Sequence, residues 1–157
     1  MNIKWLGHAS FLIQANGRRV LIDPWFQKEN QRLVPPVTSA SAVGKIDLIL
    51  ITHEHFDHFN SGEVESISSR GTSMVVAPRQ VLDQLNIPQR LKIPVNVGES
   101  FNINGIDITV TQAVHPQSSY PVGYVVSDGA KSLYHAGDTY DFYGMSQIAC
   151  DVALLPI

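Results

Sequence analysis

A cluster of histidine and aspartate in the middle of the chain is the clearest chemical feature of this sequence. Four potential metal ligands fall within six residues, directly after an apolar run: His53, His55, Asp57 and His58. Imidazole binds zinc, iron and related transition ions, and an added carboxylate also admits manganese. Alternation along an extended backbone places His53, His55 and Asp57 on one side, and a turn at Asp57 then brings His58 toward a second ion. A lone histidine is more often a hydrogen-bonded residue than a ligand, but three of the six histidines in this one segment predict a metal site.

Two later residues extend the predicted ligand set. His115 follows an apolar run and precedes Pro116, which biases it toward an extended conformation at a strand end. Asp138 comes after another expected strand, next to Gly137, which permits close approach of the backbone. Taken alone, His115 also fits a buried histidine bonded to the backbone, and Gly-Asp-Thr is a common turn. Because both residues occur in the same chain as the central cluster, we consider both of them candidate ligands.

Three further residues are candidates for supporting roles. Asp23 ends an expected strand and can accept a hydrogen bond from a ligating imidazole, which fixes the orientation of the ring. His8 and His135 can contact substrate or protonate a leaving group, because imidazole titrates near neutral pH. A turn that ends the strand explains Asp23 equally well, and each of the two histidines fits a structural role equally well.

The elements that must position these residues begin with antiparallel strands. Apolar runs over 10–14 and 19–23 flank Asn16-Gly17, and this dipeptide between apolar strands is a strong indication of a hairpin. Residues 24–45 are rich in proline, serine and threonine and predict a long loop of the kind that often borders a binding site.

The middle of the chain predicts alternating strands and helices. The run 46–52 is almost entirely apolar, which favours a central strand covered on both faces. Asn60 or Ser61 is expected to cap a short helix that runs to about Arg70, followed by a buried strand over 73–77 and a helix over 79–85.

From Val95 onward the pattern returns to hairpins, with turns at Asn104-Gly105 and Asp128-Gly129. Residues 151–157 have the composition of a buried strand, so we expect that the native protein continues past Ile157 or that another chain completes this strand. Hairpins combined with strand-helix crossovers predict an α/β or α+β layered sandwich, in a single domain over 1–157.

Composition narrows the class of protein. The net charge of −3 and the lack of a dense Lys/Arg block argue against nucleic acid as a partner. Cys150 is the only cysteine, which excludes an intramolecular disulfide and favours a reducing, cytoplasmic location. The first residues lack the apolar stretch of a signal peptide, and no segment has the roughly 20 apolar residues that span a bilayer. The expected partner is a small-molecule substrate, and a homo-oligomer is compatible with this sequence.

The order of the candidate ligands resembles the hallmark of the metallo-β-lactamase superfamily, His-x-His-x-Asp-His followed by a separate histidine and then an aspartate. The resemblance covers nearly the whole chain. Segments 5–10 and 21–24 are most similar to the branch with ascorbate-6-phosphate lactonases and N-acylphosphatidylethanolamine phospholipase D. It implies a four-layer αββα sandwich, incomplete at its C-terminus in this chain, with the site along one edge of the two sheets.

The resemblance also implies a division of the ligands between two divalent ions. His53, His55 and His115 would hold the first ion, Asp57 and His58 the second, and Asp138 would bridge them. Zinc is the ion expected first, with manganese or iron as alternatives. Family members carry a further histidine after the bridging aspartate, whereas no histidine follows His135 here. Truncation at Ile157 or a single-metal protein accounts for this difference.

The activity implied is hydrolysis of an ester, lactone or phosphodiester by a metal-activated water, with Asp57 orienting the water as the catalytic residue. Two alternatives stay open: a non-catalytic or single-metal member of the fold, and a mononuclear iron dioxygenase. Flavodiiron oxidoreductases have glutamate at the position of His55, so hydrolysis is preferred.

Overall fold

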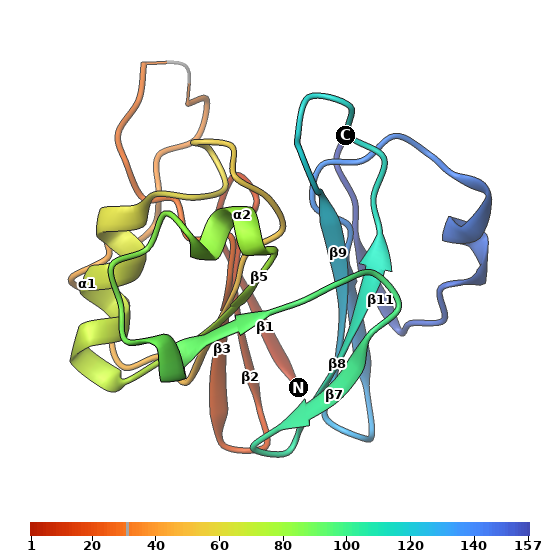
Figure 1. Cartoon of the computed structure of the whole chain (residues 1–157), viewed down its shortest axis with the longest axis horizontal. Helices are drawn as coiled ribbons and strands as arrows, with labels where there is room; N and C mark the ends of the chain where they lie inside the picture. The colour runs from red at the N-terminus through yellow and green to blue at the C-terminus, as the bar shows by residue number, and fades with distance from the viewer. Residues whose placement is uncertain (31) are drawn as a thin grey trace.

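The computed structural model describes residues 1–30 and 32–157, which form two packed β-sheets with helices on one side (Figure 1). Gln31, inside the predicted loop over 24–45, lies outside the described residues. The first sheet has the order β1 to β6. Its strands are β1 (Asn2–Gly7), β2 (Ser10–Ala15), β3 (Arg18–Ile22), β4 (Leu48–Leu50), β5 (Met74–Ala77) and β6 (Lys92–Pro94). The pairs β1–β2 and β2–β3 are antiparallel, and β3 to β6 run parallel.

The second sheet follows along the chain and packs against the first (Figure 1). Its order is β11-β10-β9-β8-β7. The strands are β7 (Ser100–Ile103), β8 (Ile106–Gln112), β9 (Val122–Ser127), β10 (Ser132–His135) and β11 (Val152–Leu154). All of its neighbours pair antiparallel except β10 and β11, which are parallel.

The predicted hairpins are confirmed. Ala15 pairs with Arg18, and both Asn16 and Gly17 have positive φ, as a two-residue type I′ turn requires. Asn104 and Gly105 form the same kind of turn between β7 and β8. Around Asp128-Gly129 the connection is longer, and the Asp128 carboxylate accepts hydrogen bonds from the amides of residues 130 and 131.

Helices connect the parallel strands and cover the outer face of the first sheet. Helix α1 (Ser61–Gly71) lies between β4 and β5, and the Asn60 side chain caps it by accepting a hydrogen bond from the Glu63 amide. Helix α2 (Arg79–Leu82) is shorter than the predicted 79–85, because the amides of residues 84 and 85 bond three residues back in tighter turns. Two 3₁₀ segments complete the set, η1 (Gln89–Leu91) and η2 (Tyr143–Gln147).

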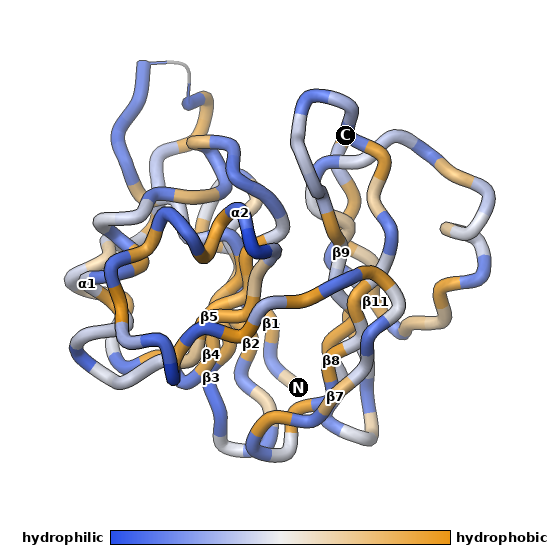
Figure 2. Tube along the Cα trace, in the orientation of Figure 1, coloured by the Kyte–Doolittle hydropathy of each residue, from blue (hydrophilic) through white to orange (hydrophobic). Residues whose placement is uncertain are grey.

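Two hydrophobic cores hold the layers together, and Figure 2 shows the hydrophobic stretches along the strands of both sheets. Strand β4 contributes to both. Ile49 packs toward the helices, whereas Leu48 and Leu50 pack between the sheets, and all three are fully buried. The prediction of a central strand covered on both faces is therefore confirmed.

The expected fold class is confirmed, with one difference in detail over the second sheet. Strand β11 lies at the edge of the described sheet, and Val152 and Leu155 are 41% and 51% exposed, so the described residues leave this apolar strand uncovered. Its completion by further residues or by another chain stays a prediction. Over the outer face of the second sheet, the described residues form a loop with η2 in place of a long helix (Figure 1). No helix within 1–30 and 32–157 is long and apolar enough to cross a membrane.

Candidate metal centre

The cluster of histidines lies where β4 ends, at the edge at which the two sheets meet. The Val122 amide of β9 donates a hydrogen bond to the carbonyl of Thr52, so the first residue of the cluster starts between the sheets. The chain then turns tightly, because the amides of His58 and Phe59 both bond to the carbonyl of His55. The sequence predicted this turn at Asp57, but it begins at His55. The turn brings the ring centroid of His58 to 4.2 Å from that of His53.

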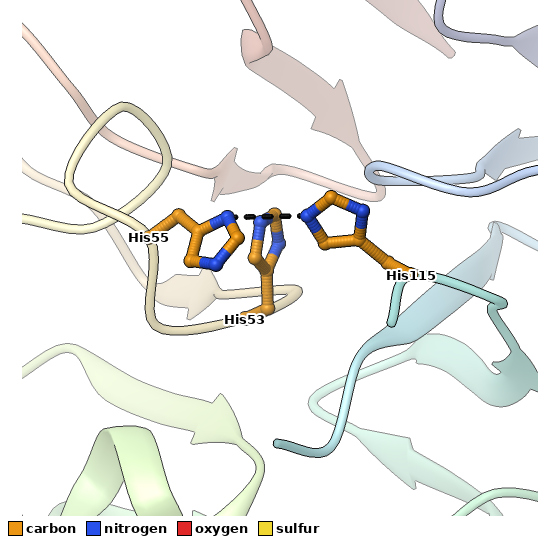
Figure 3. Close-up of side chains that lie close together, drawn as sticks. All are labelled: His53, His55 and His115. Atoms are coloured by element: carbon orange, nitrogen blue, oxygen red, sulfur yellow. Dashed lines mark hydrogen bonds between the residues drawn. The ribbon is translucent and has the colours of Figure 1, made fainter. Parts of the chain in front are cut away.

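Three imidazoles converge from the two sheets. His53 and His55 come from the loop after β4, and His115 comes from the segment after β8; Figure 3 shows the three rings turned toward one another. His115 Nε2 lies 3.2 Å from His55 Nδ1. The ring centroid of His53 lies 4.6 Å from that of His55 and 5.1 Å from that of His115. One nitrogen from each of the three lies within 4.8 Å of the other two, which is the spacing of ligands around one ion.

Asp23 orients the rings of His53 and His58 through hydrogen bonds. Its carboxylate accepts hydrogen bonds from the Thr52 amide (2.8 Å), the Thr52 hydroxyl (2.7 Å) and His58 Nδ1 (2.9 Å), and it is fully buried. Because the Thr52 hydroxyl donates to Asp23, it accepts from His53 Nδ1, which lies 3.0 Å away. Both rings therefore carry hydrogen on Nδ1 and present Nε2 to the centre.

The remaining acidic candidates lie on either side of His58. Asp138 Oδ1 lies 3.2 Å from His58 Nε2, and Asp138 groups with His53 and His58 as possible ligands of one ion. Asp57 lies on the other side, with its Oδ2 3.0 Å from His8 Nε2. His8, Asp57 and His58 form a third group of the same kind. The structure thus places His8 against a candidate ligand.

The ionisation of these groups follows from their contacts. Burial, reinforced by the charge of His58, lowers the pKa of His53 to about 4. Burial alone would also lower the pKa of His58, but its contacts with Asp138 and Asp23 raise it to about 10. His58 in turn holds the pKa of Asp138 below its ordinary range. For Asp57, burial would raise the pKa, but the hydrogen bond with His8 and the charge of His58 lower it.

His135 is buried and bonded on both nitrogens. Its Nε2 donates to the Ala9 carbonyl at 3.0 Å, and its Nδ1 accepts from the Gly137 amide at 3.1 Å. Because Nδ1 accepts this hydrogen bond, the ring is neutral, and burial lowers its pKa in the same sense. These contacts join the β1–β2 turn to the residue before Asp138. They fit the structural role that the sequence left open for His135.

Two supporting residues escaped the sequence analysis. Thr52 relays the Asp23 contact to His53, and Glu54 bonds to residues 118 and 119. The signal for Thr52 was its place between a strand and the first histidine. Nothing local indicated Glu54, because its partners are 64 and 65 residues away.

A cavity of about 740 Å³ opens beside the centre. His8, His115 and Asp138 border it on one side, and apolar side chains form much of the rest, among them Trp5, Phe11, Tyr140, Leu154 and Leu155. Among the described residues that line it there is no lysine or arginine, and Asp138 supplies the only carboxylate side chain. The centre therefore faces a largely apolar space, with no cationic Lys or Arg side chain among the described residues that line it.

The donor atoms fit a metal centre. Nε2 of His53 is buried and has no hydrogen-bond partner among the described residues, and Nε2 of His58, also buried, faces only the carboxylate of Asp138. Unpaired polar atoms are rare inside proteins and call for an explanation. A divalent ion supplies it, since imidazole binds metal through the nitrogen opposite a hydrogen-bonded Nδ1.

Comparisons with known proteins agree with this geometry. A family model described as a β-lactamase superfamily domain matches residues 18–157. A protein named UPF0173 metal-dependent hydrolase from Caldivirga maquilingensis is 38% identical, over 99% of this chain and 69% of the relative. A relative of the same name from Pyrobaculum calidifontis is 35% identical, over 100% of this chain and 72% of its own length. The solved structure of a metallo hydrolase from Ignicoccus hospitalis has a TM-score of 0.81 at 28% identity, over 99% of this chain and 70% of that one.

Proposed function

Because the chain belongs to the metallo-β-lactamase superfamily and to its UPF0173 metal-dependent hydrolases, we propose that it cleaves an ester or lactone bond in an uncharged small molecule. The observation that carries this proposal is the group of His53, His55 and His115, adjoined by two further groups that hold Asp57 and Asp138, beside a largely apolar cavity. Divalent ions held there by the imidazoles and carboxylates would lower the pKa of water to near neutrality and would stabilise negative charge on the substrate.

The chain's own residues hold and orient the reactants. His53, His55 and His115 form one set of ligands, and Asp138 lies between this set and His58. The contact with His8 keeps Asp57 ionised. Its carboxylate is placed to bind metal and to orient the attacking water by accepting a hydrogen bond from it. His8 also borders the cavity, where an imidazole can give a proton to a leaving group.

The cavity favours one substrate class over another. An ester or lactone is neutral, and its apolar part can pack against Trp5, Phe11 and Tyr140. A phosphodiester stays negatively charged, and the described lining offers no lysine or arginine to bind that charge away from the ions. A carboxylic ester or lactone is therefore preferred to a phosphodiester.

Several finer points belong to the same proposal. Two ions are expected, with zinc first and manganese or iron as alternatives, because imidazole and carboxylate donors are mixed. Kinship with the branch of ascorbate-6-phosphate lactonases and N-acylphosphatidylethanolamine phospholipase D has support from segments 5–10 and 21–24. A cytoplasmic location has support from the single cysteine, and the absence of a nucleic-acid partner from the net charge of −3. A homo-oligomer and a single domain over 1–157 also stay part of the proposal.

Replacing Asp57 with alanine tests the mechanism. We expect Asp57→Ala to lose turnover of neutral esters and lactones while its circular dichroism stays that of the wild type, because the carboxylate acts at the centre and is partly exposed. Asp83→Ala is the matched control, since Asp83 is exposed and follows α2. Full turnover in the Asp57 variant would falsify the proposed role, and a preference for phosphodiesters would contradict the substrate class.

One alternative has a specific observation in its favour. The group of His53, His55 and His115 is complete without Asp57, so it could serve a single-metal protein or a mononuclear iron dioxygenase. Metal analysis of protein purified without added ions separates these cases. One iron per chain with oxygen uptake supports the dioxygenase, one ion without turnover supports a non-catalytic member, and two ions with ester cleavage support the hydrolase.

A further inference from the structure

Glu54 lies between two candidate ligands in sequence, yet its carboxylate bonds to the opposite sheet's connecting segment. Its Oε2 accepts from the Ser118 hydroxyl at 2.8 Å. Its Oε1 accepts from the Ser119 amide at 2.8 Å and from the Ser119 hydroxyl at 3.0 Å. Bonds to a carboxylate are stronger than bonds between neutral groups. The loop that carries His53, His55, Asp57 and His58 is called the metal loop below. One side chain of this loop, Glu54, thus makes three contacts with residues that closely follow His115.

The segment that carries His115 is held by contacts outside any strand, on one side by those of Val114 with Thr139 and Tyr140 and on the other by those of Glu54. Strand β8 ends at Gln112 and β9 begins at Val122, so residues 113–121 have no strand partner along their length. Within this segment the Ser118 amide bonds to the carbonyl of His115, which makes a short turn. His55 Nε2 lies 3.2 Å from the carbonyl of Gln117 and reaches the same turn.

These contacts link the two segments that carry the three imidazoles. The Glu54 bonds join the loop of His53 and His55 to the turn that begins at His115, and His115 Nε2 lies 3.2 Å from His55 Nδ1. We propose that Glu54 is a positioning residue that docks the turn over 115–119 onto the metal loop and keeps His115 within ligating distance. This proposal rests on the proposed function only in taking His53, His55 and His115 as ligands of one ion.

The chain offers a matched control for a purely local role. Glu99 also accepts two hydrogen bonds within a turn, from the Asn96 amide and from its side chain, both at 2.9 Å. It lies directly before β7 and belongs to none of the groups of possible ligands. Removing Glu99 therefore deletes comparable contacts without touching the centre.

The test has two measurements. Calorimetry follows the titration of Zn²⁺ into the full chain after a chelator has removed bound metal, and visible absorption reports on the same chain loaded with Co²⁺. We expect Glu54→Ala to weaken binding at the three-histidine set by about 10- to 100-fold, as loss of a contact behind a ligand typically does. Glu99→Ala should bind as the wild type does. Glu54→Gln should restore most of the affinity, because its amide oxygen still accepts both Ser119 bonds and its amide nitrogen can donate to the Ser118 hydroxyl.

The outcomes separate this proposal from the proposed function. Wild-type affinity and an unchanged Co²⁺ spectrum in Glu54→Ala would overturn the positioning role, as would equal losses in the Glu54 and Glu99 alanine variants. A glutamine variant as weak as the alanine variant would also count against it. Failure of the wild type to bind Zn²⁺ or Co²⁺ would instead remove the proposed metal centre. Binding without ester cleavage would leave the role of Glu54 standing and refute only the substrate class.

Discussion

Gly137 is the position where a single methyl group should disturb both the fold and the centre. Its φ is +61°, and a left-handed conformation costs a residue with a side chain about 1–2 kcal/mol. A Cβ at this position would lie 2.8 Å from Thr52 Cβ and 3.0 Å from Thr52 Oγ1. Overpacking of this kind costs about 1–3 kcal/mol. We therefore expect Gly137→Ala to lower the free energy of unfolding by roughly 2–5 kcal/mol.

Gly129 isolates the packing part of this loss. Its φ is +86°, but a Cβ there would meet nothing within 4 Å, so Gly129→Ala should lose only the conformational cost of about 1–2 kcal/mol. Urea unfolding measures both losses, provided that the slope m is the same in the two variants. For a chain of this size, a loss of 1 kcal/mol corresponds to a fall of about 2–4 °C in Tm. Gly137→Ala should also weaken Zn²⁺ binding, because the displaced Thr52 hydroxyl bonds to both Asp23 and His53. Equal losses of stability in the two variants would refute the reasoning.

Two further predictions concern the support of the centre and of the fold. Asp23→Asn places an amide NH₂ against the Thr52 hydroxyl and His58 Nδ1, so we expect Zn²⁺ affinity to fall by about 10- to 100-fold; unchanged affinity in calorimetry would show that Asp23 does not orient His58. Asn60→Ala removes the cap of α1 and should cost about 1 kcal/mol in urea unfolding, whereas Asn60→Asp should cost much less. A larger loss in the aspartate variant would contradict the capping role.

The parts of the fold that depend on neighbouring residues could be predicted from the sequence. Asn16-Gly17 fixes its hairpin because both residues adopt positive φ in a two-residue turn. Asn60 marks the start of α1 because its side chain satisfies the Glu63 amide three residues later. The central cluster of histidines was visible for the same reason, since its members lie within six residues.

The parts that depend on distant residues could not be predicted. Nothing near Glu54 indicates that its carboxylate meets residues 118 and 119, because the packing of the two sheets brings them together. The contact between His8 and Asp57 spans 49 positions and depends on a left-handed His8, with φ of +52°. The early end of α2 likewise reflects tertiary contacts, since Lys92 Nζ donates hydrogen bonds to the carbonyls of residues 82 and 85.

The division of the centre between two layers has a mechanical consequence. His53, His55 and His58 follow a strand of the first sheet, whereas His115 and Asp138 follow strands of the second. Bonds that cross this rim include those of Glu54 with residues 118 and 119, that from the Val122 amide to the Thr52 carbonyl, and that from the Tyr124 hydroxyl to the Ile51 carbonyl. Separation of the two sheets at this rim would move the candidate ligands apart, so an ion bound by His53, His55 and His115 would link the two layers. Release of such an ion and opening of the rim would then be coupled in one equilibrium.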